Sequence, residues 1–195
     1  MKVSFCLITN NPEAFKRFVG TIDHALVSGW SYSLCVSYEQ PFLKSDLVTN
    51  KKLNMITKYR KTPDKFCFAT ARLQSFELAP KNSDYIIMCD DDFRFTKGSA
   101  NNRYSASERY KDAILYMEKN PECSAVYMKG FLGGVPYGRK VLPMVDGFYS
   151  TGKGIIIKSK NRKYDNIINP EYVVPGVGED SAIAITAYEN GCYGS

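Results

Sequence analysis

Three consecutive carboxylates, Asp90, Asp91 and Asp92, are the residues whose type and spacing point most directly to chemistry. They follow the apolar run from Tyr85 to Cys89, which is typical of a strand buried inside a parallel sheet. Adjacent carboxylates at the end of a buried strand repel one another, and a divalent cation with oxygen ligands would offset that repulsion. Taken alone, the triplet fits a metal site and a solvated acidic turn about equally well, so the rest of the chain has to decide.

A second acidic pair, Glu179 and Asp180, stands just before a helix predicted over residues 181–190. A helix N-terminus favours the ionised form of a carboxylate, as a general base requires. A metal held by one or two carboxylates leaves positions open for a diphosphate, and it can neutralise charge on a departing phosphate. The two acidic groups therefore indicate transfer chemistry in which Asp180 accepts the proton of an attacking hydroxyl.

Alternating strands and helices are predicted to position these carboxylates. The opening order of strand, helix and strand predicts a right-handed crossover, so the fold class is α/β with a mostly parallel central sheet. Residues 10–13 have the types favoured at a helix start, and Ser105 with Glu108 has the spacing of a capping box. The predicted strands cover residues 3–9, 32–38, 53–59, 84–89, 124–128 and 155–157, and the predicted helices cover residues 12–26, 43–51, 63–79, 105–119 and 181–190.

Further polar residues fall at predicted strand ends, where open α/β sheets bind their ligands. Thr9 and Asn10 follow the first strand, and Glu39 follows the second. The segment 129–154 reads as irregular, and it is dense in glycine. Such glycines suit tight turns or a close approach to a ligand, and they suit a flexible surface connection equally well.

Composition indicates one globular domain. A chain of 195 residues suffices for one sizeable core but not for two, and an apolar content of 44% is ordinary. The net charge of +6 permits an anionic partner without demanding one. Two basic stretches are interpreted mostly as solvated surface charge: Lys51, Lys52, Lys58, Arg60, Lys61 and Lys65, and then Lys158, Lys160, Arg162 and Lys163.

Cysteine usage predicts a reducing compartment. The six cysteines show no CxxC pair and no compact framework, so all are expected to be thiols in a cytoplasmic protein. Cys6, Cys35 and Cys89 lie in apolar runs, where a thiol behaves as a small hydrophobe. His24 is the only histidine, which argues against a zinc site. No signal peptide precedes the first predicted strand, and no apolar run is long enough to span a bilayer.

The order of these features, along nearly the whole chain, resembles the GT-A fold nucleotide-sugar glycosyltransferases. The segment 7–12 resembles the family's opening nucleotide-binding strand and turn, and the segment 71–74 is similar to the Ala-Arg-Asn helix that precedes the metal motif. The acidic triplet matches the Asp-x-Asp motif, and Glu179-Asp180 matches the pair whose aspartate is the catalytic base in inverting members. Each motif is weak alone, and the ordered set carries the resemblance.

The resemblance implies a Rossmann-like α/β/α sandwich, a single GT-A domain over residues 1–195 and an inverting, hexosyltransferase-type enzyme. Asp180 would be the catalytic base, and Asp92 with Asp90 would bind Mn²⁺ or Mg²⁺. Arg72 would help to hold the donor, and Glu39 would lie near its uracil or ribose. Gly152 and Gly154 would shape the sugar pocket, with Asp146 close to sugar hydroxyls. In full, the implied donor contacts are Thr9, Asn10, Glu39, Arg72, Asp90, Asp91, Gly152, Gly154 and Glu179.

The implied donor is a UDP-sugar by default, and the acceptor is a hydroxyl on a glycan or another molecule. Three features depart from the family pattern: Leu73 replaces the asparagine, no histidine follows the second acidic pair, and the chain stops at Ser195. It is therefore expected to be either a minimal enzyme or one domain of a longer polypeptide. The compact type resembles small viral glycosyltransferases, which implies the host cytoplasm for a viral chain, and phage enzymes that glycosylate modified DNA bases. The net positive charge of the chain is compatible with DNA as a partner but does not single it out.

Two other functions compete with sugar transfer. Nucleotidyl transfer also uses a nucleotide, a metal and carboxylates, but it expects a glycine-rich, lysine-containing loop after the first strand, where this chain has Thr9-Asn10-Asn11-Pro12. A non-catalytic domain that binds a nucleotide sugar or an anionic polymer would show metal-dependent binding without turnover.

Overall fold

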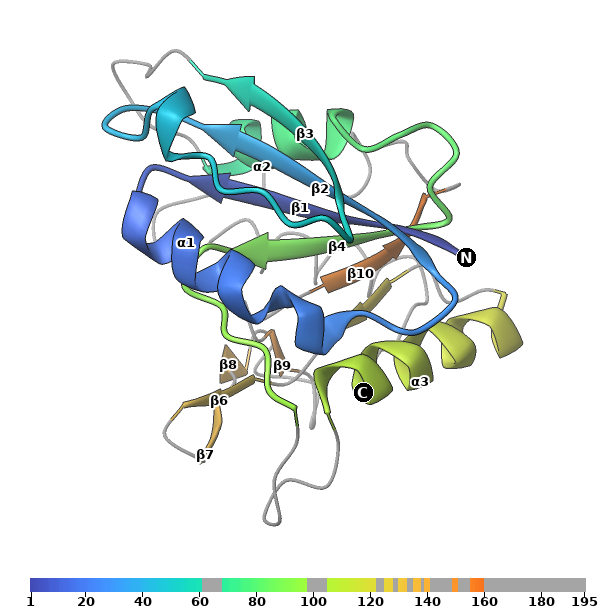
Figure 1. Ribbon diagram of the computed structural model, residues 1–195. Helices are drawn as coiled ribbons and strands as arrows, with labels where there is room; N and C mark the ends of the chain where they lie inside the picture. Colours follow the sequence, from blue (N-terminus) through green and yellow to red (C-terminus); the bar gives the residue numbers. More distant parts are fainter. Residues whose placement is uncertain are drawn as a thin grey trace.

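A twisted sheet with helices on both faces forms the body of the protein (Figure 1). The computed structural model describes residues 1–60, 68–97, 105–121, 125–127, 130–132, 135–137, 139–140, 149–150 and 155–159. The described strands are β1 Lys2–Thr9, β2 Ser31–Tyr38, β3 Asn54–Tyr59, β4 Tyr85–Asp90, β5 Ala125–Tyr127, β6 Gly130–Leu132, β7 Val135–Tyr137, β8 Arg139–Lys140, β9 Tyr149–Ser150 and β10 Ile155–Lys158. The described helices are α1 Pro12–Thr21, α2 Phe68–Glu77 and α3 Ala106–Lys119, with 3-10 turns η1 Ile22–Ala25 and η2 Lys44–Asp46.

The main sheet has the strand order β3-β2-β1-β4-β10-β5. Strands β1 to β4 are all parallel, and Cys6 of β1 lies opposite Cys35 of β2 and Met88 of β4. Strand β10 is antiparallel to both of its neighbours, β4 and β5. The strands β1, β2 and β4 are almost entirely buried, as expected for parallel strands that are covered on both faces. The α/β class with a mostly parallel sheet is therefore confirmed.

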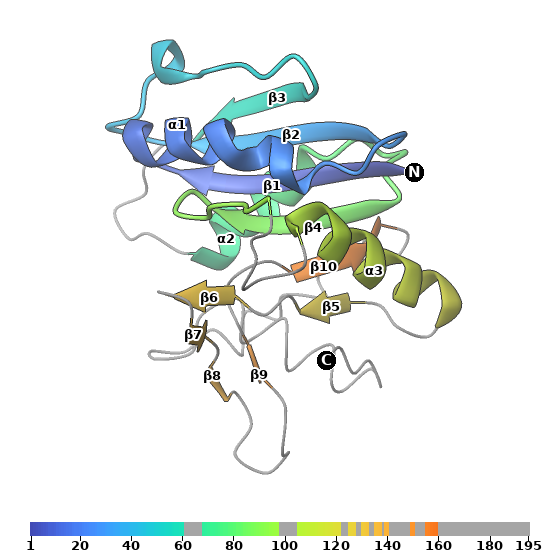
Figure 2. The same cartoon turned by 60° about the horizontal axis from the view of Figure 1, so that its bottom comes forward.

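Helices α1 and α3 cover one face of the sheet, and α2 covers the other (Figures 1 and 2). Between the sheet and helices α1 and α3 lies an aromatic cluster of Phe5, Phe18, Phe95 and Tyr110. The ring centroids of Phe5 and Tyr110 are 6.0 Å apart, and those of Phe18 and Phe95 are 5.4 Å apart, both edge to face. Such pairs contribute beyond their buried area, so this cluster locks α1 and α3 to β1.

Local capping explains where two of the helices begin. The Asn11 side chain accepts from the backbone N–H groups of Glu13 and Ala14 at 3.1 and 3.0 Å, and Pro12 occupies the first turn of α1. Ser105 and Glu108 form the predicted capping box of α3. Both predicted helix starts are therefore confirmed.

The predicted helix over residues 43–51 is wrong, because only the single 3-10 turn η2 forms there. The Asp46 carboxylate accepts from the Leu43 backbone N–H at 2.7 Å and closes that turn. Leu47 and Val48, the half-buried apolar residues that follow, are adjacent in sequence and cannot share one face of a helix. The prediction of an irregular segment over 129–154 also needs correction, because β6 pairs with β7 and β8 pairs with β9.

The three cysteines of the main sheet that the structure describes, Cys6, Cys35 and Cys89, are buried free thiols, as predicted. Burial raises the pKa of the Cys89 thiol well above its ordinary value, although the nearby Arg72 guanidinium opposes that effect. These thiols are therefore packed as small hydrophobic groups in the core.

Candidate functional site

The carboxyl ends of four parallel strands meet at one edge of the sheet (Figure 1). In the order of the sheet they present Arg60 after β3, Glu39 after β2, Thr9 at the end of β1 and Asp90 at the end of β4. Backbone hydrogen bonds join neighbouring ends, because the Arg60 N–H donates to the Tyr38 carbonyl at 2.7 Å and the Glu39 N–H donates to the Thr9 carbonyl at 3.2 Å. The topology therefore gathers charged residues that are far apart in sequence at the edge where such sheets bind ligands.

Arg72 contacts Asp90, the first aspartate of the acidic triplet, from the buried side of the sheet edge. Its side chain on α2 is fully buried, and its guanidinium donates to the Cys89 carbonyl and to the Asp90 carboxylate. The Asp90 side chain keeps 39% of its surface exposed. A buried arginine is stable only where its N–H groups and charge are paired. The predicted Arg72 thus contacts Asp90 directly and holds it at the edge of the sheet.

Asp91, the middle aspartate, is tied to the first strand. The Thr9 hydroxyl donates to Asp91 Oδ2 at 2.6 Å, and Thr9 itself is buried. Partial burial raises the pKa of Asp91, and repulsion from Asp90 and Asp92 adds to this, whereas the Thr9 hydrogen bond opposes it. The hydroxyl of Thr9 therefore serves to anchor the acidic loop, which sequence reasoning had not assigned to it.

Asp92 and Asn10 lie on the exposed side of the same edge. Within the described residues, no group of three or more His, Cys, Asp and Glu side chains is close enough together to hold a metal ion. The exposed position of Asp92 beside the half-exposed Asp90 provides carboxylate oxygens, which are the ligands that Mg²⁺ and Mn²⁺ prefer.

Glu39 is buried at the end of β2 and faces Arg60. Their side chains are about 5% and 6% exposed, and Arg60 Nη2 lies 3.8 Å from Glu39 Oε1. Burial lowers the pKa of Arg60, the Glu39 charge opposes that shift, and the charge of Arg72 adds to it. Arg60 is therefore an exception in a basic stretch that was interpreted mostly as solvated surface charge. Its position directly after a strand, like that of Glu39, is the signal that could have identified it.

Other predicted site residues lie outside the described part of the chain. They are Asp146, Gly152, Gly154, Glu179 and Asp180.

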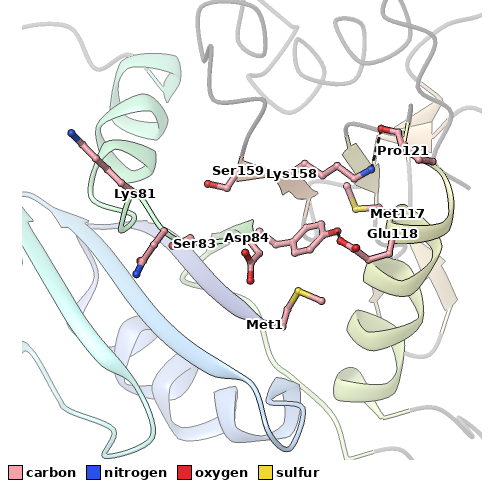
Figure 3. A pocket seen from close by; sticks show the side chains of 11 residues that line it. Met1, Lys81, Ser83, Asp84, Met117, Glu118, Pro121, Lys158 and Ser159 are labelled. Carbon is pink, nitrogen blue, oxygen red and sulfur yellow. Dashed lines mark hydrogen bonds between the residues drawn. The ribbon is translucent and has the colours of Figure 1, made fainter.

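A cavity of about 620 Å³ lies at the opposite end of the sheet, where β1 and β4 begin (Figure 3). Lysines and carboxylates both line it. The Tyr85 hydroxyl donates to Glu118, and Lys158 Nζ donates to the carbonyls of Asn120 and Pro121 at 3.0 and 3.2 Å. The cavity thus lies at the amino ends of β1 and β4, whereas open α/β sheets bind ligands at the carboxyl ends of their strands, so we place the candidate site at the acidic edge.

Comparison with known proteins supports the fold of this edge. No family model and no curated protein matches the chain. Crystal structures of S. aureus TarS do match: TarS 1–349 in complex with UDP aligns with a TM-score of 0.61 at 17% identity, over 97% of this chain and 56% of that one. The complex of TarS 1–349 with UDP-GlcNAc gives a TM-score of 0.59 at 17% identity, over 97% of this chain and 54% of that one.

The chain thus spans about half the length of the TarS 1–349 structures and 34% of the longer TarS structure. The likeness shows the fold, a Rossmann-like GT-A sandwich, as the sequence predicted. None of the helices in the described ranges combines the length and apolar character needed to cross a bilayer.

Proposed function

We propose that this chain is a glycosyltransferase domain that uses a nucleoside-diphosphate sugar, with a UDP-sugar as the default donor. One observation carries the proposal: the acidic triplet stands at the carboxyl edge of a GT-A sheet, where Arg72 holds Asp90 and Thr9 holds Asp91. The likeness to TarS, which has been crystallised with UDP and with UDP-GlcNAc, supports the same class of ligand.

The residues at the edge fit a divalent cation of the Mg²⁺ or Mn²⁺ kind. Asp92 and Asp90 would hold it, because they offer hard carboxylate oxygens and still leave room for phosphate oxygens and water. When bound, such an ion stabilises negative charge on the departing nucleoside diphosphate. Arg72 would orient Asp90 for this task, and Glu39 would contact the nucleoside.

The remaining step is an inverting sugar transfer. Asp180 would remove the proton of the acceptor hydroxyl, whose oxygen attacks the anomeric carbon while the nucleoside diphosphate leaves from the opposite face. Asn10, Gly152, Gly154 and Glu179 would complete the donor pocket. The acceptor is a hydroxyl on a glycan or another molecule.

The test is a donor screen that begins with UDP-GlcNAc and Mn²⁺ and measures nucleoside diphosphate release. We expect Asp92→Ala to lower kcat/KM about a hundredfold, because it removes stabilisation of the leaving group. Asp180→Asn should lower kcat by about two orders of magnitude or more, because it removes the general base. Asp112→Ala, an exposed carboxylate on α3, is the matched control and should retain activity.

Two outcomes would contradict the proposal in different ways. Full activity in both the Asp92 and the Asp180 variant would rule out the assigned mechanism. Tight, metal-dependent UDP binding without turnover of any donor would instead identify a binding module.

A further inference from the structure

A buried ion pair lies at the edge of the sheet, beyond the acidic triplet. Arg60 Nη2 is 3.8 Å from Glu39 Oε1, and it donates to the Ser37 carbonyl at 3.5 Å. Both charged residues are less than a tenth exposed. Removing two charges from water is costly unless their geometry or a ligand compensates, so a pair of this kind is weak as a purely stabilising device.

The second carboxylate oxygen of Glu39 is the unusual feature of this pair. In the described part of the protein, Glu39 Oε2 is buried and has no hydrogen-bond partner. The great majority of buried polar atoms are hydrogen-bonded, because an unpaired acceptor has lost its water and gained nothing in return. An ionised carboxylate can only accept, so the missing partner must be an N–H or O–H donor.

The backbone places this acceptor in the ligand-binding edge. The Glu39 N–H donates to the carbonyl of Thr9, whose side chain holds Asp91. The end of β2, which carries Glu39, is therefore separated only by β1 from the loop after β4 that is proposed to hold the diphosphate. A nucleotide whose diphosphate lies at the triplet and whose nucleoside extends along this edge over β1 would meet Glu39 at the end of β2.

We propose that Arg60 is a positioning residue for nucleotide recognition, which pairs with one oxygen of Glu39 so that the other accepts a hydrogen bond from the bound nucleoside. The inference rests on the proposed function. It adds Arg60, which directly follows β3 and does not contact the substrate. The permanent charge and the planar N–H groups of arginine suit this task, because they fix the direction of the carboxylate as well as balancing its charge.

Two groups on the nucleoside are the candidate donors: the imide N–H of the base and the 2′-hydroxyl of the ribose. UDP carries both. CDP keeps the ribose hydroxyls but lacks the imide N–H, and dTDP keeps the imide N–H but lacks the 2′-hydroxyl. The proposal therefore expects wild-type protein to bind UDP more tightly than at least one of these two nucleotides, and the weaker one identifies the donor.

Calorimetry with UDP, CDP and dTDP on the full chain tests the role of Arg60. We expect Glu39→Gln and Arg60→Met each to weaken UDP binding about tenfold or more, since each disturbs a hydrogen bond to a charged acceptor. The double variant should bind no more weakly than Glu39→Gln alone, because Arg60 acts through Glu39. Arg60→Lys should recover part of the loss, and Lys58→Met, an exposed residue of the same strand, should bind like the wild type.

The Arg60→Met variant leaves the buried Glu39 carboxylate without its positive partner, which could unfold the protein. Thermal unfolding is therefore measured for every variant. If that variant does not fold, Arg60→Lys and the double variant, which removes both charges, decide the question. Losses that multiply in the double variant, or Arg60 variants that bind all three nucleotides like the wild type, would overturn the role of Arg60 alone. A wild-type chain that binds none of the three nucleotides would overturn both this inference and the proposed function.

Discussion

Burial decides what each charged residue at the edge of the sheet does. Arg72 and Arg60 are buried, and each guanidinium lies against a carboxylate of a neighbouring strand end. Asp92 is exposed at the tip of the loop. The buried charges therefore hold the edge in shape, and the exposed one is accessible from solvent.

The pKa of Asp91 gives a prediction at the scale of one residue. Because burial raises this pKa above the ordinary 3.8, the folded state binds the proton more tightly than the unfolded chain. Asp91 therefore favours folding below pH 3.8, and that contribution is lost as the pH rises through its folded pKa. Asp91→Asn stays neutral, so the stability of the wild type relative to this variant should increase as the pH falls from 7 toward 4.

Urea unfolding at a series of pH values measures this difference. Thr9→Val is the companion variant, because it removes the hydrogen bond to Asp91, and it should lower the free energy of unfolding at pH 7 by about 1 kcal/mol. A wild type that loses stability relative to Asp91→Asn on acidification would show that the pKa of Asp91 is lowered.

At the scale of elements, short local signals fix where α1 begins, and α1 then covers the sheet beside the site. The helix buries Phe15 and Phe18 against the core and presents charged residues to solvent. Its N-cap, Asn11, also belongs to the turn that follows Thr9, because the Asn11 backbone N–H donates to the Thr9 hydroxyl at 3.2 Å. The start of the helix and the anchor of the acidic loop are thus one continuous turn.

Removal of the Asn11 cap should therefore be measurable. Asn11→Ala leaves two N–H groups of the first turn of α1 without their side-chain acceptor and should cost about 1 kcal/mol of stability in urea unfolding. Asn10→Ala, at the exposed preceding position, is the control and should change stability by less than about 0.5 kcal/mol. Equal effects of the two substitutions would show that the cap does not contribute.

For the molecule as a whole, β10 joins distant parts of the chain into one sheet. It lies between β4 and β5 and pairs with both, although a long stretch of sequence separates it from β4. Ile156 is fully buried at its centre, opposite Ile87 and Val126. The described part of the protein should therefore unfold as one cooperative unit.

Ile156→Ala tests that cooperativity. The cavity it creates should lower the free energy of unfolding by about 2–5 kcal/mol, whereas Leu115→Ala, at an exposed position on α3, should cost less than about 0.5 kcal/mol. Trp30 is the sole tryptophan and precedes β2, on the far side of the sheet from β10. Its fluorescence and the far-ultraviolet circular dichroism should shift together, and two separate transitions would contradict a single unit.

The features that the sequence alone determined are those encoded by short stretches of chain. The apolar run before Asp90 predicted a buried strand, residues 10–13 and Ser105 predicted helix starts, and the order of elements predicted the fold. The family resemblance also led to Arg72, which contacts Asp90. The roles of Asp180 and the glycines remain predictions.

Only the tertiary structure decided which residues meet at the edge of the sheet. Thr9 and Asp91 are 82 residues apart in sequence, and their hydrogen bond depends on the parallel register of β1 and β4. The basic stretch around Arg60, interpreted mostly as surface charge, does not reveal that β3 packs beside β2 and buries Arg60 against Glu39. Local propensities act over a few residues, whereas strand order and register set the contacts between them.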